Sequence, residues 1–300
     1  MIAPPPRFVE AEIGSYCNRR CRWCPNGHST RGQCHEHVDP AVFGALLDGL
    51  QRMDYGGRFA FHNYNEPLLD PFLFERMAQT RQALPRAYFV LYSNGDPLTA
   101  PLLDQLAEQT VREVRVTLYP TAGKILAAPD AETIARFKQR LGLGQKGVTD
   151  VKPRKIQWRA QLRGLRLVVN APRISRYTER CGSFRWRHQD GRDERTWPCY
   201  MPMQALAVDY HGAIKLCCHI YDSLDPDNRP YILGNVVDTR FDRVWHSTRL
   251  QKLRRQLAQA DFTGLPMCSR CQHRMTPRMQ RLVLATTTKI GLTWPDRSST

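Results

Sequence analysis

Strand-like segments alternate with amphipathic helical segments over the first 170 residues, and this alternation limits the fold more than any other feature of the sequence. In residues 8–13, apolar side chains alternate with two glutamates, which is typical of a strand. Asp39 and Pro40 then form a typical helix start. Strands separated by helices pair in parallel, so the pattern predicts an α/β fold whose sheet is closed or partly closed into a barrel.

Further elements follow in the same alternating order. The predicted strands are residues 8–13, 57–61, 87–92, 113–119 and 165–170, and the predicted helices are residues 39–51, 71–83, 101–109 and 130–140. Residues 142–155 are rich in glycine and lysine and are predicted as a long loop. Nearer the C-terminus, residues 206–208 and 214–216 flank a His-Gly turn and predict a β-hairpin, and residues 241–260 predict a helix.

Three cysteines directly follow the first predicted strand. Cys17, Cys21 and Cys24 have C-x3-C-x2-C spacing. Three such thiolates hold three irons of a 4Fe-4S cube and leave the fourth iron without a protein ligand. A zinc knuckle is the alternative, but it needs a fourth ligand, and the nearest candidates, His28 and Cys34, fit no common finger spacing.

With Trp23 before the third cysteine, the motif resembles the signature of the radical S-adenosylmethionine (SAM) superfamily. The resemblance implies a partial (β/α) barrel whose open iron chelates the amino and carboxylate groups of SAM. It also implies that one electron from the cluster cleaves SAM to methionine and a 5′-deoxyadenosyl radical, which abstracts a hydrogen atom from the substrate. Trp23 itself is a candidate cofactor-binding residue.

Two later segments resemble SAM-binding elements of that superfamily. Glu66-Pro67 matches the end of its Gly-Gly-Glu-Pro element, which implies that Glu66 receives the SAM amino group. Tyr64 and Asn65 stand in place of the two glycines, and we expect Asn65 to adopt the left-handed backbone conformation that asparagine tolerates. Ser93 and Asn94 resemble the element near the SAM ribose and methionine, although Asn-Gly also occurs in plain turns.

A second set of cysteines resembles the Twitch appendage, a short relative of the SPASM extension of radical SAM enzymes. Cys199 and Cys217 lie in a C-x12-G-x4-C pattern, and Cys268 and Cys271 form a distant C-x2-C. The resemblance implies an auxiliary 4Fe-4S cluster on a β-hairpin and a helix. Four thiolates leave no open iron, and zinc also suits four cysteines. Cys218 is adjacent, but the glycine spacing selects Cys217.

Within the superfamily, the chain resembles the Twitch-containing aminocyclitol dehydrogenases of aminoglycoside biosynthesis. The resemblance implies that Arg180 contacts the substrate. Cys218-His219 replaces the aromatic and acidic pair of those dehydrogenases, so we do not expect an identical aminocyclitol substrate. Cys181 and Cys218 are further candidate catalytic residues, since Cys181 neighbours Arg180 and Cys218 neighbours an auxiliary ligand.

These resemblances predict a radical SAM dehydrogenase with two 4Fe-4S clusters and SAM. The expected substrate is a polar small molecule, such as a sugar, an aminocyclitol or a similar natural product, whose carbinol carbon is oxidised to a ketone while the auxiliary cluster accepts the surplus electron. A flavodoxin or ferredoxin is the expected electron donor. One alternative is an epimerase in which a cysteine thiol returns a hydrogen atom; another is an enzyme that modifies a ribosomal peptide.

Composition sets further limits. Ten cysteines in a chain with no apolar segment long enough for a signal peptide or a membrane span suggest a cytoplasmic metalloprotein. The formal charge of +16 is spread along the chain, so we do not expect nucleic acid as a partner, although a nucleic-acid-binding metalloprotein is the alternative from another class. The expected domains are a barrel at 1–185, a Twitch domain at 186–275 and a tail at 276–300.

Overall fold

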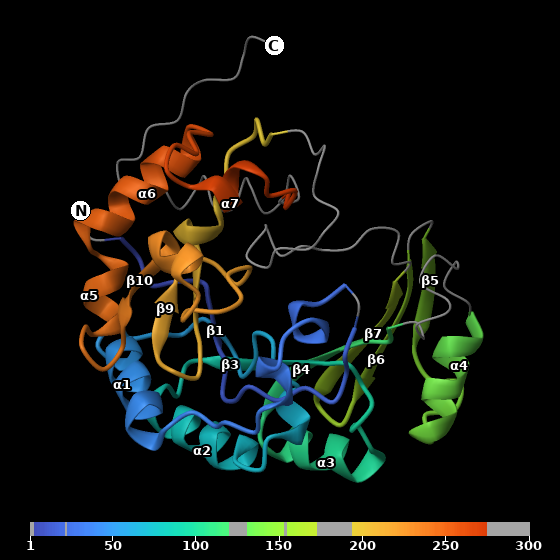
Figure 1. Ribbon diagram of the computed structural model, residues 1–300. Coiled ribbons are helices and arrows are strands. Elements are labelled where there is room, and N and C mark those ends of the chain that lie inside the picture. The colour runs from blue at the N-terminus through green and yellow to red at the C-terminus, as the bar shows by residue number, and fades with distance from the viewer. Residues whose placement is uncertain (1–2, 22, 120–130, 153–154, 173–193, 275–300) are drawn as a thin grey trace. The chain divides into compact units, whose positions relative to one another are not determined.

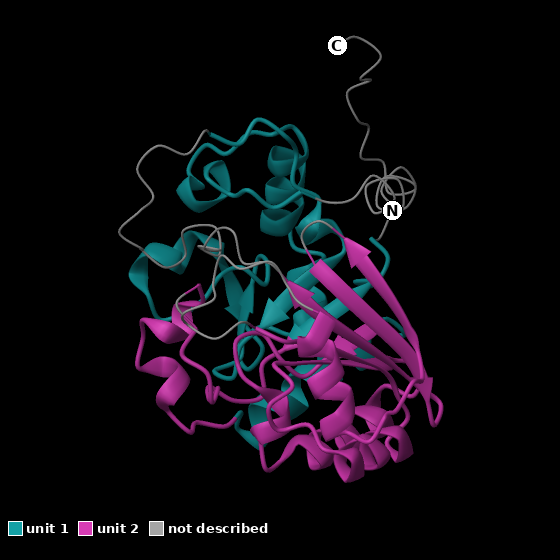
Figure 2. Cartoon of the chain, turned by 90° about the vertical axis from the view of Figure 1, so that its right-hand side faces the viewer, with its two compact units in different colours: residues 1–10, 38–57, 179–300 teal, residues 11–37, 58–178 magenta. Residues whose placement is uncertain are grey.

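The computed structural model describes residues 3–21, 23–119, 131–152, 155–172 and 194–274 (Figure 1). The chain forms two compact units, which are coloured separately in Figure 2. Unit 1 contains Met1–Glu10, Val38–Gly57 and Glu179–Thr300, and unit 2 contains Ala11–His37 and Arg58–Thr178. No helix within the described ranges combines the length and the hydropathy of a membrane span.

Unit 2 contains a mixed sheet with helices between its parallel strands. Its strands, in spatial order, are β2 (Arg58–Ala60), β3 (Tyr88–Ser93), β4 (Val111–Thr117), β7 (Leu165–Pro172), β6 (Lys155–Leu162) and β5 (Val148–Lys152). Its α-helices are α2 (Leu73–Ala83), α3 (Ala100–Glu108) and α4 (Ala131–Arg140). Strands β2, β3, β4 and β7 are parallel, and β6 and β5 continue the sheet antiparallel. The predicted α/β fold is confirmed.

Alternation along the strands gives this sheet one apolar face and one polar face. Val116, Val169 and Trp158 are fully buried on the face that also contacts α3 and α4. Ile134 and Phe137 of α4 are buried as well. The neighbouring residues in each strand point to the opposite face and are polar or charged in most positions, because side chains alternate along a strand.

The predicted loop over residues 142–155 is wrong. Val148–Lys152 and the start of Lys155–Leu162 form an antiparallel pair, with Val151 opposite Ile156. Arg163 and Gly164 both have positive φ and make the tight turn from β6 into β7. Four of the five β5 residues are exposed, so the sequence of this strand has no apolar alternation that would predict it. The segment is extended because it pairs with β6, not because it buries apolar side chains.

The described residues of unit 1 form the predicted hairpin and four α-helices. Its strands are β1 (Phe8–Ala11, up to Glu10 in this unit), β8 (Ala205–Val208), β9 (Ala213–Lys215) and β10 (Ile232–Asn235), and its α-helices are α1 (Pro40–Gln51), α5 (Phe241–Trp245), α6 (Thr248–Ala258) and α7 (Pro266–Ser269). Strands β8 and β9 are antiparallel, with Val208 opposite Ile214, as predicted. The Asp39 side chain caps α1 by accepting a hydrogen bond from the Ala41 N–H, also as predicted.

The predicted helix over residues 241–260 is in fact two helices. The first ends at Trp245, and the Ser247 hydroxyl accepts a hydrogen bond from the Leu250 N–H to start the second. Serine at this position is a strong N-cap because it satisfies a free backbone donor. The buried side chain of Arg254, in the second helix, donates hydrogen bonds to the carbonyl of Trp245, at the end of the first helix, and to the carbonyl of Pro202.

Candidate functional site

The first cysteine set lies in a loop of unit 2 that directly follows β1. Cys17, Cys21 and Cys24 are all half-buried. The Cys24 N–H donates to the Cys21 carbonyl, and the Cys17 N–H donates to the Gly32 carbonyl. Gly27 lies so close to this loop that an added Cβ would stand 2.2 Å from the Cys21 carbonyl oxygen. The loop conformation that places the thiols near one another therefore requires a glycine at this position.

Burial makes these thiols weak acids. It raises the pKa of Cys17 to about 11 and that of Cys21 to about 12, and the neighbouring Cys24 thiol raises both further. Such thiols are protonated near neutral pH, so they must lose protons when they ligate iron. Within the described residues, no three histidine, cysteine, aspartate or glutamate side chains share a position suited to one metal ion. A cube differs from a single ion because it binds each thiolate at a separate iron.

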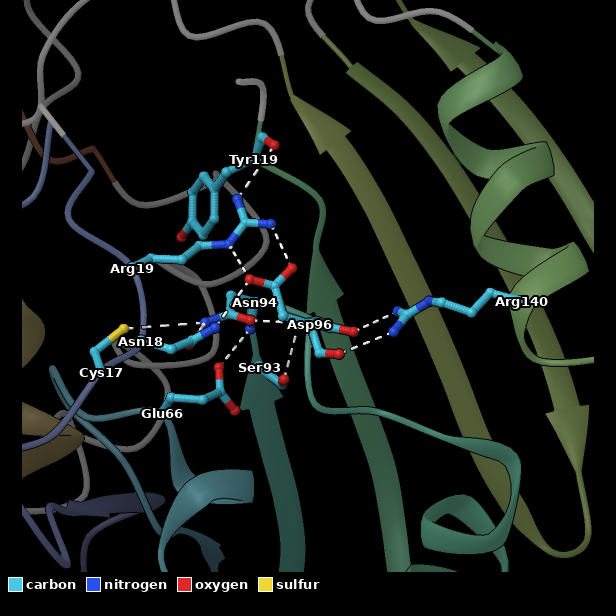
Figure 3. A network of polar contacts seen from close by, with 10 residues as sticks. Cys17, Asn18, Arg19, Glu66, Ser93, Asn94, Asp96, Tyr119 and Arg140 are labelled. Atoms are coloured by element: carbon cyan, nitrogen blue, oxygen red, sulfur yellow. Dashed lines mark hydrogen bonds and ion pairs between the residues drawn. The ribbon is translucent and has the colours of Figure 1, made fainter. Parts of the chain in front are cut away.

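Glu66 and Asn94 meet beside Cys17 (Figure 3). The Asn94 N–H donates to the Glu66 carboxylate at 2.7 Å, and the Asn94 side-chain amide lies 3.9 Å from the Cys17 sulfur. Glu66 is only 3 % exposed, and its own N–H donates to the carbonyl of Tyr16. Burial raises the pKa of Glu66 to about 7, although hydrogen bonds from Asn94, Ser93 and Leu68 lower it. Two predicted SAM-binding elements therefore meet at the cysteine loop.

An ion pair that the sequence reasoning missed joins this loop to the segment after β3. Arg19 donates two hydrogen bonds to the Asp96 carboxylate, at 2.7 and 2.5 Å, and Asn18 donates a third. Arg140 of α4 donates to the backbone carbonyls of Gly95 and Asp96 (Figure 3). The two arginines therefore fix the turn that carries Asn94. Asp96 follows Ser93, Asn94 and Gly95 in the sequence, but no local pattern pairs it with Arg19.

A second missed ion pair is fully enclosed beneath the loop. Arg31, 8 % exposed, donates to both carboxylate oxygens of Glu12, and Glu12 also accepts the N–H of Tyr64. The Asn26 side chain donates to the Tyr64 carbonyl at 2.7 Å. These contacts hold the segment before Glu66 against the cysteine loop. Because the pair is buried, removing one partner would leave an uncompensated charge.

The other predicted cofactor-binding residues also lie in this region. Trp23 is 8 % exposed, and its ring centroid is 5.7 Å from that of Tyr119. The Ser93 hydroxyl accepts the N–H of Gly95. Asn65 does not have positive φ, so the expected left-handed conformation is wrong. Its side chain instead forms a local turn, accepting the Asn63 N–H and donating to the Phe61 carbonyl.

The second cysteine set is assembled in unit 1. Cys199 and Cys217 precede and follow the β8–β9 hairpin, Cys268 lies on α7, and Cys271 lies just after it. Burial raises the pKa of Cys199 and of Cys217, and the neighbouring Cys268 thiol raises that of Cys217 further. The four thiols therefore lie close enough to raise one another's pKa values, and a closed cluster takes four thiolates. Cys218 is half-buried beside this set.

Arg195, which the sequence reasoning also missed, lies against the second set. It is 5 % exposed and donates to the backbone carbonyls of Trp197, Pro198 and Cys271. Its positive charge also favours the thiolate form of Cys199. Among the described residues no carboxylate pairs with Arg195. A buried cation needs a negative partner, and the thiolates of an iron–sulfur cluster fit this requirement.

Two predicted substrate residues, Arg180 and Cys181, lie outside the described residues. The assignment of individual ligands and substrate contacts therefore remains a prediction. What the described residues show is donor chemistry that suits the expected groups. One set has three thiols with a carboxylate and an amide beside it, and the other has four thiols with a buried arginine.

Comparisons with known proteins agree with this geometry. Residues 199–272 match the SPASM model, an iron-sulfur cluster-binding domain. The chain is 25 % identical over 274 residues to an S-adenosyl-L-methionine-dependent 2-deoxy-scyllo-inosamine dehydrogenase of Niallia circulans, covering 89 % of this chain and 92 % of that protein.

The fold is also similar to those of solved structures. The structure of BtrN in complex with AdoMet and 2-DOIA matches with a TM-score of 0.65 and 23 % identity, covering 91 % of this chain and 95 % of that chain. The structure of anSMEcpe with bound AdoMet matches with a TM-score of 0.56 and 12 % identity, covering 95 % of this chain and 93 % of that chain. The partial-barrel fold is thereby confirmed.

Proposed function

We propose that this chain, which is similar to an S-adenosyl-L-methionine-dependent dehydrogenase and matches an iron–sulfur cluster-binding domain of SPASM type, is a radical SAM enzyme that oxidises a carbinol carbon of a polar small molecule to a ketone. The two 4Fe-4S clusters and SAM are its cofactors. When bound, they supply the radical that removes hydrogen from the carbinol carbon and the acceptor for the surplus electron. The net reaction converts the alcohol and SAM into ketone, methionine, 5′-deoxyadenosine and a proton.

The residues of unit 2 bind and orient SAM in this proposal. Cys17, Cys21 and Cys24 hold the first cluster, and Glu66 accepts a hydrogen bond from the SAM amino group. Asn94 is held between Glu66 and the cysteine loop by two hydrogen bonds, so it reaches the cofactor from a fixed position. Rigid positioning of this kind lowers the entropic cost of bringing the radical and the substrate into a reactive geometry.

The observation that carries oxidation, rather than another outcome, is the second set of thiols. Cys199, Cys217, Cys268 and Cys271 supply four protein ligands, so this cluster has no open iron for SAM or substrate. A closed cluster beside a buried arginine suits the acceptance of an electron. We propose that a one-electron donor of flavodoxin or ferredoxin type reduces the first cluster, and that the electron accepted by the auxiliary cluster returns to this donor pool, so the net reaction consumes no electron. The division into a barrel at 1–185 and a Twitch domain at 186–275 is part of the same proposal.

The substrate of the similar dehydrogenase is an aminocyclitol by its name. We propose a sugar or cyclitol here, with Arg180 in contact with the reacting hydroxyl group. Cys218-His219 supplies no carboxylate for a substrate amine at that place. Cys218 and His219 therefore do not bind a substrate amino group through a carboxylate in this proposal.

Paired cysteine variants test the proposal. In anaerobically reconstituted protein with a strong reductant and a panel of sugars and cyclitols, Cys199→Ala should still produce 5′-deoxyadenosine but should form no ketone. Cys17→Ala should lose both products, because it removes a ligand of the first cluster. Chromatography follows the nucleoside and mass spectrometry follows the ketone. Ketone formation by Cys199→Ala, or an intact SAM pool in reduced wild-type protein, would contradict the proposal.

Epimerisation is the second candidate, and the position of Cys218 favours it. This half-buried thiol is next to Cys217, where it would return a hydrogen atom to the substrate carbon. Wild-type product made in deuterium oxide would then carry one solvent deuterium at the inverted carbon, and Cys218→Ala would stop turnover. Oxidation predicts neither result, so the same reactions separate the two candidates.

A further inference from the structure

The polar face of the sheet in unit 2 continues from the SAM-binding elements. Tyr92 of β3 points to this face, and its ring stacks on His62, which lies after β2. Asn94 lies two residues beyond Tyr92 in the direction of the strand and contacts Cys17. The polar face is therefore continuous with the cofactor site, whereas α3 and α4 contact the opposite, apolar face.

Register places three hydrogen-bonding side chains in one row across this face. Thr117 of β4 is opposite Asn170 of β7, and Asn170 is opposite Gln157 of β6. Gln157 donates to the Asn170 side chain at 2.8 Å. This row lies at the carboxyl ends of β4 and β7, the same end of the sheet as Asn94. A row of hydroxyl and amide groups suits the hydroxyl groups of a sugar or cyclitol.

Cations flank that row. Arg115 of β4 and Arg159 of β6 both stand opposite Val168 of β7, so the two arginines lie on either side of one small apolar side chain. Lys155 lies on the other side of the amide row, opposite Pro172. The pKa of Lys155 is lowered by partial burial and by the positive charges of Lys152, Arg115 and Arg159, which shows that these cations act on one another.

Acidic residues only partly neutralise this group. Glu113 pairs with Arg115 and Arg166, and Asp150 pairs with Arg159. The polar faces of β4 to β7 carry five cationic side chains (Arg115, Arg166, Arg159, Lys155 and Lys152) but only these two acidic ones. Within the described part of the chain, Lys155 makes no ion pair, and the buried Arg159 Nε atom has no hydrogen-bond partner. An excess of positive charge on a half-buried surface suits an anionic ligand.

We propose that the polar face of β4, β7 and β6 binds the substrate, and that the substrate is a sugar or cyclitol with a phosphate or carboxylate group held by Lys155 and Arg159 of β6. This inference rests on the proposed function and names its substrate class. Neighbouring strands are about 4.8 Å apart, so β6 lies about 14 Å from β3. The anionic group is thus remote from the reacting carbon, and its binding orients that carbon toward the cofactor site.

Binding measurements with four sugars test this inference on the holoprotein. Anaerobic calorimetry in the presence of SAM would compare glucose 6-phosphate, glucuronate, glucose and glucosamine. We expect one of the two anionic sugars to bind at least about tenfold more tightly than glucose, since a charged hydrogen bond contributes this much. Whichever anionic sugar binds more tightly identifies phosphate or carboxylate as the group. Equal affinities for all four sugars would overturn the proposal.

Variants test the assigned residues. Lys155→Gln and Arg159→Gln should each weaken binding of the anionic sugar about tenfold. Arg136→Gln is the matched control, because this exposed arginine lies on α4, which contacts the apolar face, and it should leave the affinity unchanged. Lys155→Glu should favour glucosamine over glucose 6-phosphate, a gain that a misfolded variant would not show. Unchanged affinity in Lys155→Gln and Arg159→Gln would refute the assignment.

The SAM assay on the same samples separates the two proposals. Wild-type protein that cleaves SAM but binds glucose 6-phosphate no better than glucose would overturn the anionic substrate and leave the radical SAM function standing. Protein that binds the anionic sugar through Lys155 but leaves SAM intact would support the binding surface and contradict the proposed oxidation.

Discussion

At the scale of single residues, the site depends on buried polar groups whose partners are far away in the sequence. Glu66 accepts hydrogen bonds from Asn94 and Leu68, and Arg195 donates to three carbonyls on two segments. In each case burial makes the charge costly unless a ligand or a cluster completes the set of partners. These two residues therefore give the most direct tests of cofactor binding.

Glu66 should make SAM binding depend on pH. Its pKa is raised by burial to about 7, so the carboxylate fraction increases as the pH rises through this value. SAM affinity should therefore increase between about pH 6 and pH 8, by at most tenfold per unit below the pKa. Glu66→Gln should bind SAM about tenfold more weakly and lose this increase.

Anaerobic equilibrium binding across this pH range measures the effect. Glu75→Gln, an exposed carboxylate on α2, is the control and should follow the wild-type profile. A Glu66→Gln profile parallel to that of the wild type would show that another group causes the pH dependence.

Arg195 should set the reduction potential of the auxiliary cluster. Its buried positive charge favours the reduced, more negative cluster, so Arg195→Gln should lower the midpoint potential, by about 60 mV for each 1.4 kcal/mol of lost interaction. Arg270→Gln is the matched control, because Arg270 is exposed next to Cys271 and solvent screens its charge.

Redox titration followed by electron paramagnetic resonance measures both clusters in one sample. The potential of the first cluster serves as an internal reference, because Cys17, Cys21 and Cys24 belong to the other unit. An equal shift of the midpoint potential in Arg195→Gln and Arg270→Gln would show that the burial of Arg195 does not determine its effect on the auxiliary cluster.

At the scale of elements, the β6–β7 hairpin positions most of the proposed substrate surface. The turn between these strands has Arg163 at φ 48° and Gly164 at φ 87°. Both values lie in the left-handed region, and two such residues make the turn that suits the twist of a hairpin. The register of Arg159 against Val168 follows from this turn, since a slip by one residue would move every side chain to the other face.

Two glycine substitutions should change the free energy of unfolding in opposite directions. An added Cβ meets no atom within 4 Å at either Gly164 or Gly44, so only the backbone conformation differs. Gly164→Ala should destabilise the protein by about 1–2 kcal/mol because alanine is strained at positive φ. Gly44→Ala, in the middle of α1, should stabilise it by about 0.5–1 kcal/mol. Anaerobic thermal unfolding compares the two variants with the wild type. If both substitutions changed the free energy of unfolding in the same direction, the explanation from backbone conformation would be contradicted.

At the scale of the whole molecule, the two cysteine sets belong to different compact units. Cys17, Cys21 and Cys24 lie in unit 2, whereas the four auxiliary thiols lie in unit 1. Each set is assembled by contacts within its own unit, so loss of one cluster leaves the ligands of the other in place. This separation is why Cys199→Ala and Cys17→Ala give different expected products in the test of the proposed function.

The sequence alone determined the alternation of strands and helices from β1 to β4, strand β7, the β8–β9 hairpin, both cysteine sets, and the elements at Glu66 and Asn94. These signals are local, because hydrophobic periodicity, capping residues and ligand spacing each depend on residues that are close together in the sequence. Local reasoning missed β5, where the pattern is weak, as well as β6, and it missed the break at Ser247 inside a predicted helix. It also gave Asn65 a backbone conformation that the structure does not have.

Only the tertiary structure decided which distant side chains meet. Arg19 with Asp96, Arg31 with Glu12, and Arg195 with the Cys271 carbonyl are paired across 19 or more residues, and no sequence period links them. The positions of Arg115 and Arg159 on either side of Val168 likewise depend on strand order and register. The spacing of metal ligands is determined within a short stretch of chain. The partner of a buried charge depends instead on which segment packs against it in the folded protein, because a buried charge is costly without a partner.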